Sequence, residues 1–239
     1  MALPIQNATI YTATVPSTKQ EIKFRAFLVK EEKALLIAQQ SEDPTVMLDT
    51  LKQIIKSCVK TELDVNSLAL FDIEYIFAQL RSKSVGEVVE IIVACDVCPD
   101  DDIKARVKLT FDLSKLQVNF PAEHNKKIAL FDDVGVVMRY PSLSMIKDLE
   151  GMDQTDAESV FKVVTKSIDF IYDGDELHYA KDQTEVELKE FLENLNQEQF
   201  KKIQQFFETM PKLSKEVQYD CPVCKHHHEK VIEGLNSFF

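Results

Sequence analysis

The sequence predicts an α+β fold in which an N-terminal β-hairpin and helical unit precede a four-cysteine, zinc-ribbon-like pair of hairpins. Three observations predict it. Strand-forming stretches flank two short cysteine pairs, apolar residues at helical spacing follow an N-terminal hairpin, and the segment between the cysteine pairs far exceeds an ordinary ribbon loop. We therefore expect a folded α+β insertion within the ribbon. The expected division is residues 1–84, a discontinuous ribbon of residues 85–120 and 212–239, and an insertion of residues 121–211.

The N-terminal unit is expected to begin with a β-hairpin. Residues 9–15 and 21–27 have the composition and alternation of strands and flank a polar turn that contains Pro16. Three helices should follow, because apolar residues then recur at helical spacing. They are expected at residues 31–40, 44–60 and 67–80. Cys58 falls on the apolar face of the second helix, which indicates a small core residue.

The ribbon is predicted from two cysteine pairs at hairpin tips. Cys95 and Cys98 lie between the expected strands 88–94 and 103–109, and Cys221 and Cys224 lie between strands 216–220 and 227–232. Two sulfurs at this spacing fit one side of a tetrahedral ion, so two tips together offer four ligands. The sequence therefore predicts one structural zinc ion bound by the thiolates of Cys95, Cys98, Cys221 and Cys224.

Other roles for these four cysteines have less support in the sequence. A redox dithiol of the thioredoxin type needs a helix that starts at its first cysteine, and neither pair opens one. Disulfides need an oxidising compartment, and residues 1–4 lack the basic and apolar regions of a signal peptide. Free buried thiols remain an alternative. One of His226, His227 and His228 could replace a sulfur, but neighbouring strand residues alternate faces, so most should be solvated.

The insertion has its own order of elements. Paired strands are expected at residues 127–131 and 134–140 and again at 168–172 and 176–179, with helices at 155–168, 185–194 and 197–210. The second strand pair flanks Asp173-Gly174-Asp175, a composition typical of hairpin turns. Pro211 should end the last helix and return the chain to the ribbon.

Composition narrows the classes of function. The chain has 40 acidic against 28 basic residues, a net charge of −12, so bulk electrostatics oppose direct nucleic-acid binding. A zinc-ribbon nucleic-acid-associated factor is a disfavoured alternative, because Asp96 and residues 100–102 at the first tip would repel phosphate.

No apolar run reaches the length of a membrane span. No catalytic motif is found, and a zinc ion with four thiolates has no open position, so we expect no enzyme.

Two stretches, residues 16–38 and 71–87, together with the cysteine pairs, resemble the baseplate hub subunit family of T4-like contractile-tailed bacteriophages. The resemblance implies a non-enzymatic structural component of the hub, located in the virion tail baseplate and in the host cytoplasm during assembly. Its partners would be other hub and tail proteins in a multi-subunit assembly. The family also includes relatives regarded as hub assembly chaperones that are absent from the mature virion, which is the alternative.

A partner surface is expected on the N-terminal hairpin. Its large apolar side chains cannot all face one small core, because alternate strand residues point to opposite faces. These side chains are Tyr11, Val15, Ile22, Phe24, Phe27 and Leu28. We hypothesise that one face, with Phe24 and Arg25, docks on a hub partner. Alternatively, the helices of residues 31–80 cover that face.

Overall fold

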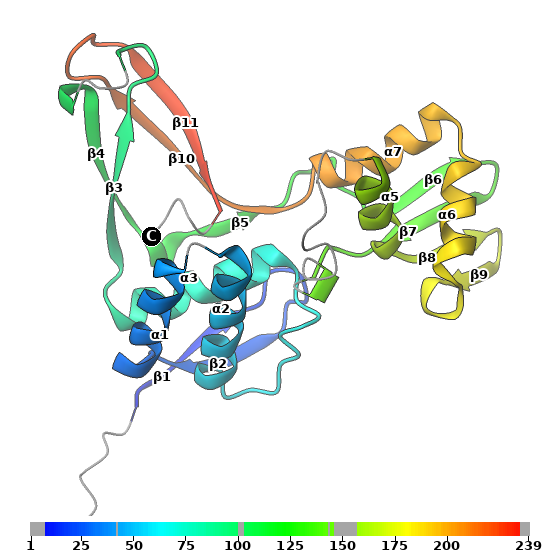
Figure 1. Cartoon of the computed structure of the whole chain (residues 1–239), viewed down its shortest axis with the longest axis horizontal. Coiled ribbons are helices and arrows are strands. Elements are labelled where there is room, and N and C mark those ends of the chain that lie inside the picture. Colours follow the sequence, from blue (N-terminus) through cyan, green and yellow to red (C-terminus); the bar gives the residue numbers. More distant parts are fainter. Residues whose placement is uncertain (1–7, 42, 100–102, 143, 146–156, 235–239) are drawn as a thin grey trace, which may run out of the picture. The chain divides into compact units, whose positions relative to one another are not determined.

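The structure is a computed structural model that describes residues 8–41, 43–99, 103–142, 144–145 and 157–234. The chain divides into two compact units. The first unit comprises Met1–Val65, Phe71–Asn119 and Lys212–Phe239, and the second comprises Asn66–Leu70 and Phe120–Pro211. Helices and antiparallel sheets occur in both units (Figure 1), which confirms the predicted α+β class.

The first unit starts with the expected hairpin, formed by β1 (Ile10–Thr14) and β2 (Glu21–Arg25) in antiparallel register. The turn between them is anchored to a helix of the same unit. The backbone N–H and the hydroxyl of Ser17 donate to the carboxylate of buried Asp72, at 2.9 and 2.5 Å. A carboxylate out of contact with water needs such donors, so the turn and the helix stabilise one another.

Three helices follow the hairpin: α1 (Val29–Gln40), α2 (Pro44–Cys58) and α3 (Leu70–Ser84). Helix α2 begins as its sequence predicts, because Asp43 caps it by accepting from the N–H of Thr45 at 2.9 Å. Cys58 is fully buried, as expected of a core residue. Helix α3 begins later than expected, because Ala69 forms an isolated antiparallel bridge with Ser142 instead of entering the helix.

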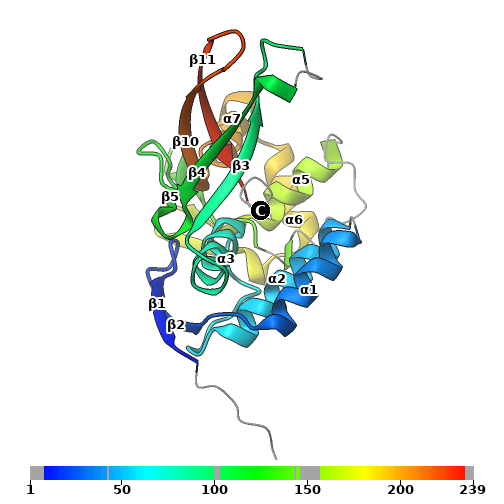
Figure 2. The ribbon, with the colours of Figure 1, turned by 90° about the vertical axis from the view of Figure 1, so that its left-hand side faces the viewer.

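The two cysteine hairpins also belong to the first unit. Strands β3 (Val88–Ala94) and β4 (Arg106–Asp112) form one sheet, and β10 (Lys212–Asp220) pairs with β11 (His227–Glu233) in another. The apolar faces of the hairpins share a core with α3, composed of Ala78, Val89, Leu113, Leu116, Leu213 and Ile232. Figure 1 and Figure 2 place both hairpin tips at the same end of this unit.

Two details of the ribbon differ from the sequence prediction. Ile103–Ala105, expected to open a strand, forms a short 3-10 helix instead, and the carbonyl of Ala105 accepts from the N–H of Cys95 at 3.1 Å. A further strand, β5 (Gln117–Asn119), pairs with the start of β10, which begins at Lys212 and so is longer than expected. Both changes arise from pairings that a local pattern does not specify.

The second unit contains a four-stranded antiparallel sheet in the order β6-β7-β8-β9. Its strands are β6 (Lys127–Phe131), β7 (Val134–Met138), β8 (Ile168–Asp173) and β9 (Glu176–Tyr179), and its helices are α5 (Ala157–Lys166), α6 (Glu185–Glu193) and α7 (Gln197–Glu208). Side chains of the sheet and the helices form one apolar core that includes Val136, Ile168, Leu192, Ile203 and Phe206. All the elements expected here are present; residues 155–156 of the expected first helix lie outside the described residues.

Gly135 on β7 provides a test of this packing. A methyl group at Gly135 would meet the hydroxyl of Tyr172, its register partner on β8, and the backbone carbonyl of Ile128 on β6. We expect Gly135→Ala to lower the free energy of unfolding by about 1–3 kcal/mol, because the sheet must shift to admit the methyl group. Denaturant titration measures this loss. Adding Tyr172→Leu should restore only part of it, because the Ile128 carbonyl stays; unchanged stability in Gly135→Ala would contradict the packing described.

Candidate metal centre

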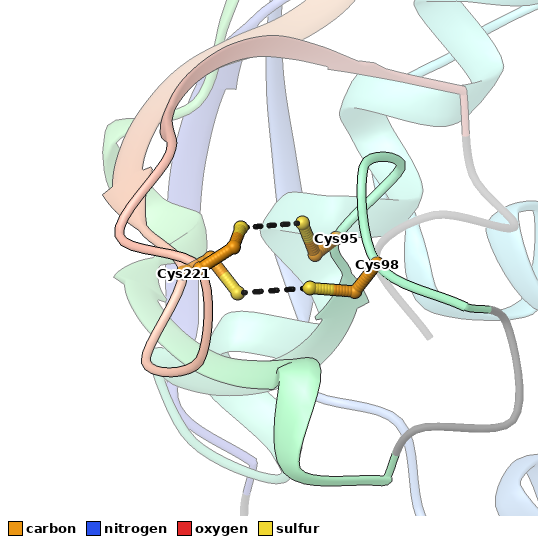
Figure 3. Close-up of side chains that lie close together, drawn as sticks. Cys95, Cys98 and Cys221 are labelled. Carbon is orange, nitrogen blue, oxygen red and sulfur yellow. Dashed lines mark hydrogen bonds between the residues drawn. The ribbon is translucent and has the colours of Figure 1, made fainter.

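Two loops carry the sequence-predicted ligands. Cys95 and Cys98 follow β3, and Cys221 and Cys224 follow β10, so each pair lies just beyond the last residues that pair within its hairpin. The structure brings all four together, from both hairpins (Figure 3). We call these four residues the cysteine cluster. Its members come from opposite sides of the intervening insertion, so the cluster joins distant parts of the chain.

The spacing of the sulfurs distinguishes between possible chemistries. The Sγ atoms of Cys95 and Cys224 are 3.7 Å apart, those of Cys98 and Cys221 are 3.8 Å apart, and all four lie within 4.8 Å of one another. A disulfide needs about 2.05 Å, so these are free thiols. Two sulfurs bound to one tetrahedral zinc at about 2.3 Å would lie about 3.8 Å apart. The donor atoms and their spacing therefore fit a zinc ion.

Backbone geometry shapes the loops around the sulfurs. The N–H of Val97 donates to the Sγ of Cys95 at 3.4 Å. In the second loop the N–H of Cys221 donates to the carbonyl of His226 at 2.9 Å, and the N–H of Lys225 donates back to the carbonyl of Cys221 at 3.0 Å. Lys225 has a φ of 61°, in the left-handed region, which closes this tight turn. Both sulfur-bearing turns are thus fixed by hydrogen bonds of the chain itself.

The thiols of the cysteine cluster differ in pKa. Partial burial and the three neighbouring thiols raise the pKa of Cys98 to about 12. Burial also opposes ionisation of Cys221, but N–H donors from Cys224 and Val223 and its thiol neighbours lower its pKa to about 7. Four thiolates this close repel one another, so all four ionise together only when a cation lies among them.

Burial of the cluster is also asymmetric. Cys95 and Cys221 are 2% and 0% exposed, and with Ala105 they form a small apolar cluster against which Cys98 packs. Cys224 is exposed. Water therefore reaches the cluster at Cys224 and, in part, at Cys98.

His227 and His228, the first two residues of β11, lie on opposite faces of the strand as alternation predicts, and His226 precedes the strand. His226 and His227 are exposed, whereas His228 is 4% exposed and its Nε2 lies 3.2 Å from the Sγ of Cys95. Its Nδ1 lies 3.1 Å from a carboxylate oxygen of Asp96. The sequence interpretation missed this position of His228. A signal existed, because Ile232 faces the core and counting back along β11 in steps of two reaches His228.

The partner surface expected at Phe24 and Arg25 is corrected by the structure. Phe24 is 1% exposed, forms an isolated bridge with Val59 and contacts the ring of Tyr11. Arg25 is also buried, and its guanidinium donates to Glu31 at 2.8 Å. The helical segment covers this face of the hairpin, which is the alternative that the sequence left open. Neither side chain is accessible to a partner.

The fold and the cysteine cluster define an α+β protein in which two hairpins, distant in sequence, meet at four thiols. The chain belongs to the family described as T4 bacteriophage base plate protein, whose model matches residues 8–239. This confirms the resemblance to baseplate proteins of T4-like phages and implies a structural role in a phage tail, in assembly with other tail proteins. Comparisons with curated proteins and with solved structures found no match.

None of the helices in the described part of the chain combines the length and the apolar character that a bilayer span requires.

Proposed function

We propose that this protein is a non-enzymatic component of the baseplate hub that acts through protein–protein contacts, and that Cys95, Cys98, Cys221 and Cys224 bind one structural zinc ion. Family membership supports the tail location. The observation that carries the metal assignment is the set of four sulfurs within 4.8 Å of one another, with opposed pairs at 3.7 and 3.8 Å. Thiolate sulfur at tetrahedral spacing is typical of structural zinc.

A structural role for the metal follows from its ligand set. Four protein ligands fill the coordination of zinc and leave no position for water or substrate. Bound there, the ion would stabilise the contact between the two hairpin tips, whose strands continue into the shared core with α3. The protein would then present a fixed surface to its neighbours, which is what a component of a multi-subunit assembly needs.

The hub assignment predicts a defined occupancy of the mature particle. We expect quantitative mass spectrometry of purified virions to detect this protein at a fixed low copy number that matches the symmetry of the hub. The control is a known tail protein measured in the same digest. Detection in assembly intermediates but not in mature virions would refute the hub assignment and support an assembly chaperone.

Nucleic-acid binding is the weaker alternative for a cysteine ribbon. The net charge of −12 opposes the approach of a phosphate backbone. Asp96 and Asp220 lie beside the cysteine loops, so both hairpin tips carry carboxylates that oppose the approach of phosphate. Affinity for duplex or single-stranded DNA that falls steeply with salt would favour this alternative.

A further inference from the structure

His228 lies beside the cysteine cluster without being one of its four sulfurs. It projects from β11 into the space between Cys95 and Asp96, with Nε2 3.2 Å from the Sγ of Cys95 and Nδ1 3.1 Å from Oδ1 of Asp96. Its ring stacks on Tyr219 of β10, with the centroids 4.8 Å apart and the planes at 16°. Asp96 in turn lies 3.3 Å from the ammonium group of Lys230. The imidazole is thus held on both nitrogens and on one face.

The geometry indicates that His228 is not a direct ligand of the metal. The four sulfurs form one group of mutually close ligand atoms, whereas His228 groups with Cys95 and Asp96. A nitrogen and a sulfur bound to the same tetrahedral zinc would lie about 3.5 Å apart. The observed 3.2 Å is a hydrogen-bond distance to sulfur, and four thiolates already complete the coordination.

A donor at this position has a clear physical effect. Zinc with four thiolates carries two excess negative charges, which a buried site tolerates poorly. Cys95 is 2% exposed, so water cannot supply hydrogen bonds to its sulfur. The described nitrogens within reach of this sulfur are the backbone N–H of Val97, at 3.4 Å, and Nε2 of His228, at 3.2 Å. Charge-assisted hydrogen bonds to the thiolate stabilise its ionised, metal-binding form.

We propose that His228 donates a hydrogen bond from Nε2 to the Cys95 thiolate, and that Asp96 positions the ring by accepting from Nδ1. The proposal rests on the zinc site proposed above. His228 and Asp96 are positioning residues that increase the affinity of the site for zinc without touching the ion.

The test compares zinc affinity in matched variants of the full-length protein. His228→Phe keeps a ring for stacking on Tyr219 but removes both hydrogen bonds. We expect it to retain one zinc ion per chain but to bind it roughly 10–100-fold more weakly in competition with a chromophoric chelator. His227→Phe is the control, because His227 is exposed and contacts Asp220 and Glu229 instead of sulfur. Its zinc affinity should equal that of the unaltered protein.

A second variant tests the role of Asp96 and guards against misfolding. The side chain of Asp96 is exposed, so Asp96→Asn should fold normally and should weaken zinc binding in the same direction but by less. Because Asp96 acts through His228, the double variant should bind zinc no more weakly than His228→Phe alone. Independent, additive losses would overturn the positioning role, and so would unchanged affinity in Asp96→Asn.

Cobalt substitution separates a hydrogen-bond donor from a ligand. With Co²⁺ in the site, His228→Phe should keep the visible absorption pattern of four-sulfur coordination, while its sulfur-to-cobalt charge-transfer band moves to lower energy. A change of coordination pattern would show that His228 is a ligand and would overturn the proposal. Equal zinc affinity and an unmoved band would overturn it while leaving the zinc site intact. Absence of metal from the unaltered protein would refute the zinc site itself, and the proposal with it.

Discussion

Replacing Cys221 with serine is expected to release the proposed zinc ion and to lower the stability of the first unit strongly. A ligand held at a thousand times its dissociation constant stabilises the folded state by about 4 kcal/mol, and structural zinc sites commonly bind more tightly than that requires. Cys221 is fully buried and its N–H is bonded within the loop, so no other ligand can take its place. We therefore expect a loss of at least about 4 kcal/mol.

Metal analysis and thermal unfolding, measured on the same preparations, test this expectation. The unaltered protein should contain one zinc ion per chain, and Cys221→Ser should contain none and melt at a lower temperature. Cys58→Ala is the matched control: Cys58 is a buried cysteine on α2 outside the cluster, so its loss should leave the zinc content unchanged. A metal-free, fully folded unaltered protein would rule out the site.

The second large effect concerns the buried ion pair between β2 and α1. The guanidinium of Arg25 donates to Glu31 at 2.8 Å, and the other carboxylate oxygen of Glu31 accepts from the N–H of Leu28 at 2.8 Å. Ser57 of α2 donates to Glu31 at 2.9 Å. Glu31→Ala leaves the buried charge of Arg25 unpaired, so we expect it to cost about 3–5 kcal/mol. Glu32→Ala, the adjacent exposed position, should cost little by comparison.

The same pair makes stability depend on pH. Burial opposes the ionised form of Glu31, but hydrogen bonds from Arg25, Leu28 and Ser57 outweigh it and lower its pKa from 4.5 to about 2. The folded state therefore binds the proton more weakly than the unfolded state. Up to about 3 kcal/mol of stabilisation is present above pH 4.5 and is lost as the pH falls towards 2. Acid titration of Glu31→Ala should lack this component; an identical acid profile in both proteins would contradict it.

The sequence specified the cysteine cluster well because short cysteine spacings and strand patterns are local signals. Strands β3 and β11 begin where their strand patterns start in the sequence. Two hairpin tips that each carry two sulfurs combine most simply into one group of four sulfurs. The three residues of β5 gave no such signal, since they become a strand only by pairing with β10 across the whole insertion. The sequence left the burial of Phe24 and Arg25 open as an alternative for the same reason, because it depends on α1 and α2 folding against the hairpin.

His228 shows a different limit of sequence reasoning. Its residue type indicated solvent or metal, and its position in a run of three histidines gave no preference among them. Only its distance in steps of two from Ile232, and the placement of Asp96 on the other hairpin, assign it to the inner face. A contact between residues so far apart in sequence depends on the register of two separate hairpins, which a local pattern does not fix.

The separation of 123 residues between Cys98 and Cys221 has a consequence for biosynthesis. At a ribosomal rate of roughly 5–20 residues per second, the second pair emerges roughly 6–25 seconds after the first. During that interval the ribosome adds β4, β5 and the insertion, but two of the four sulfurs do not yet exist. The cluster can therefore close only on a chain translated through residue 224, so a prematurely terminated product would lack it.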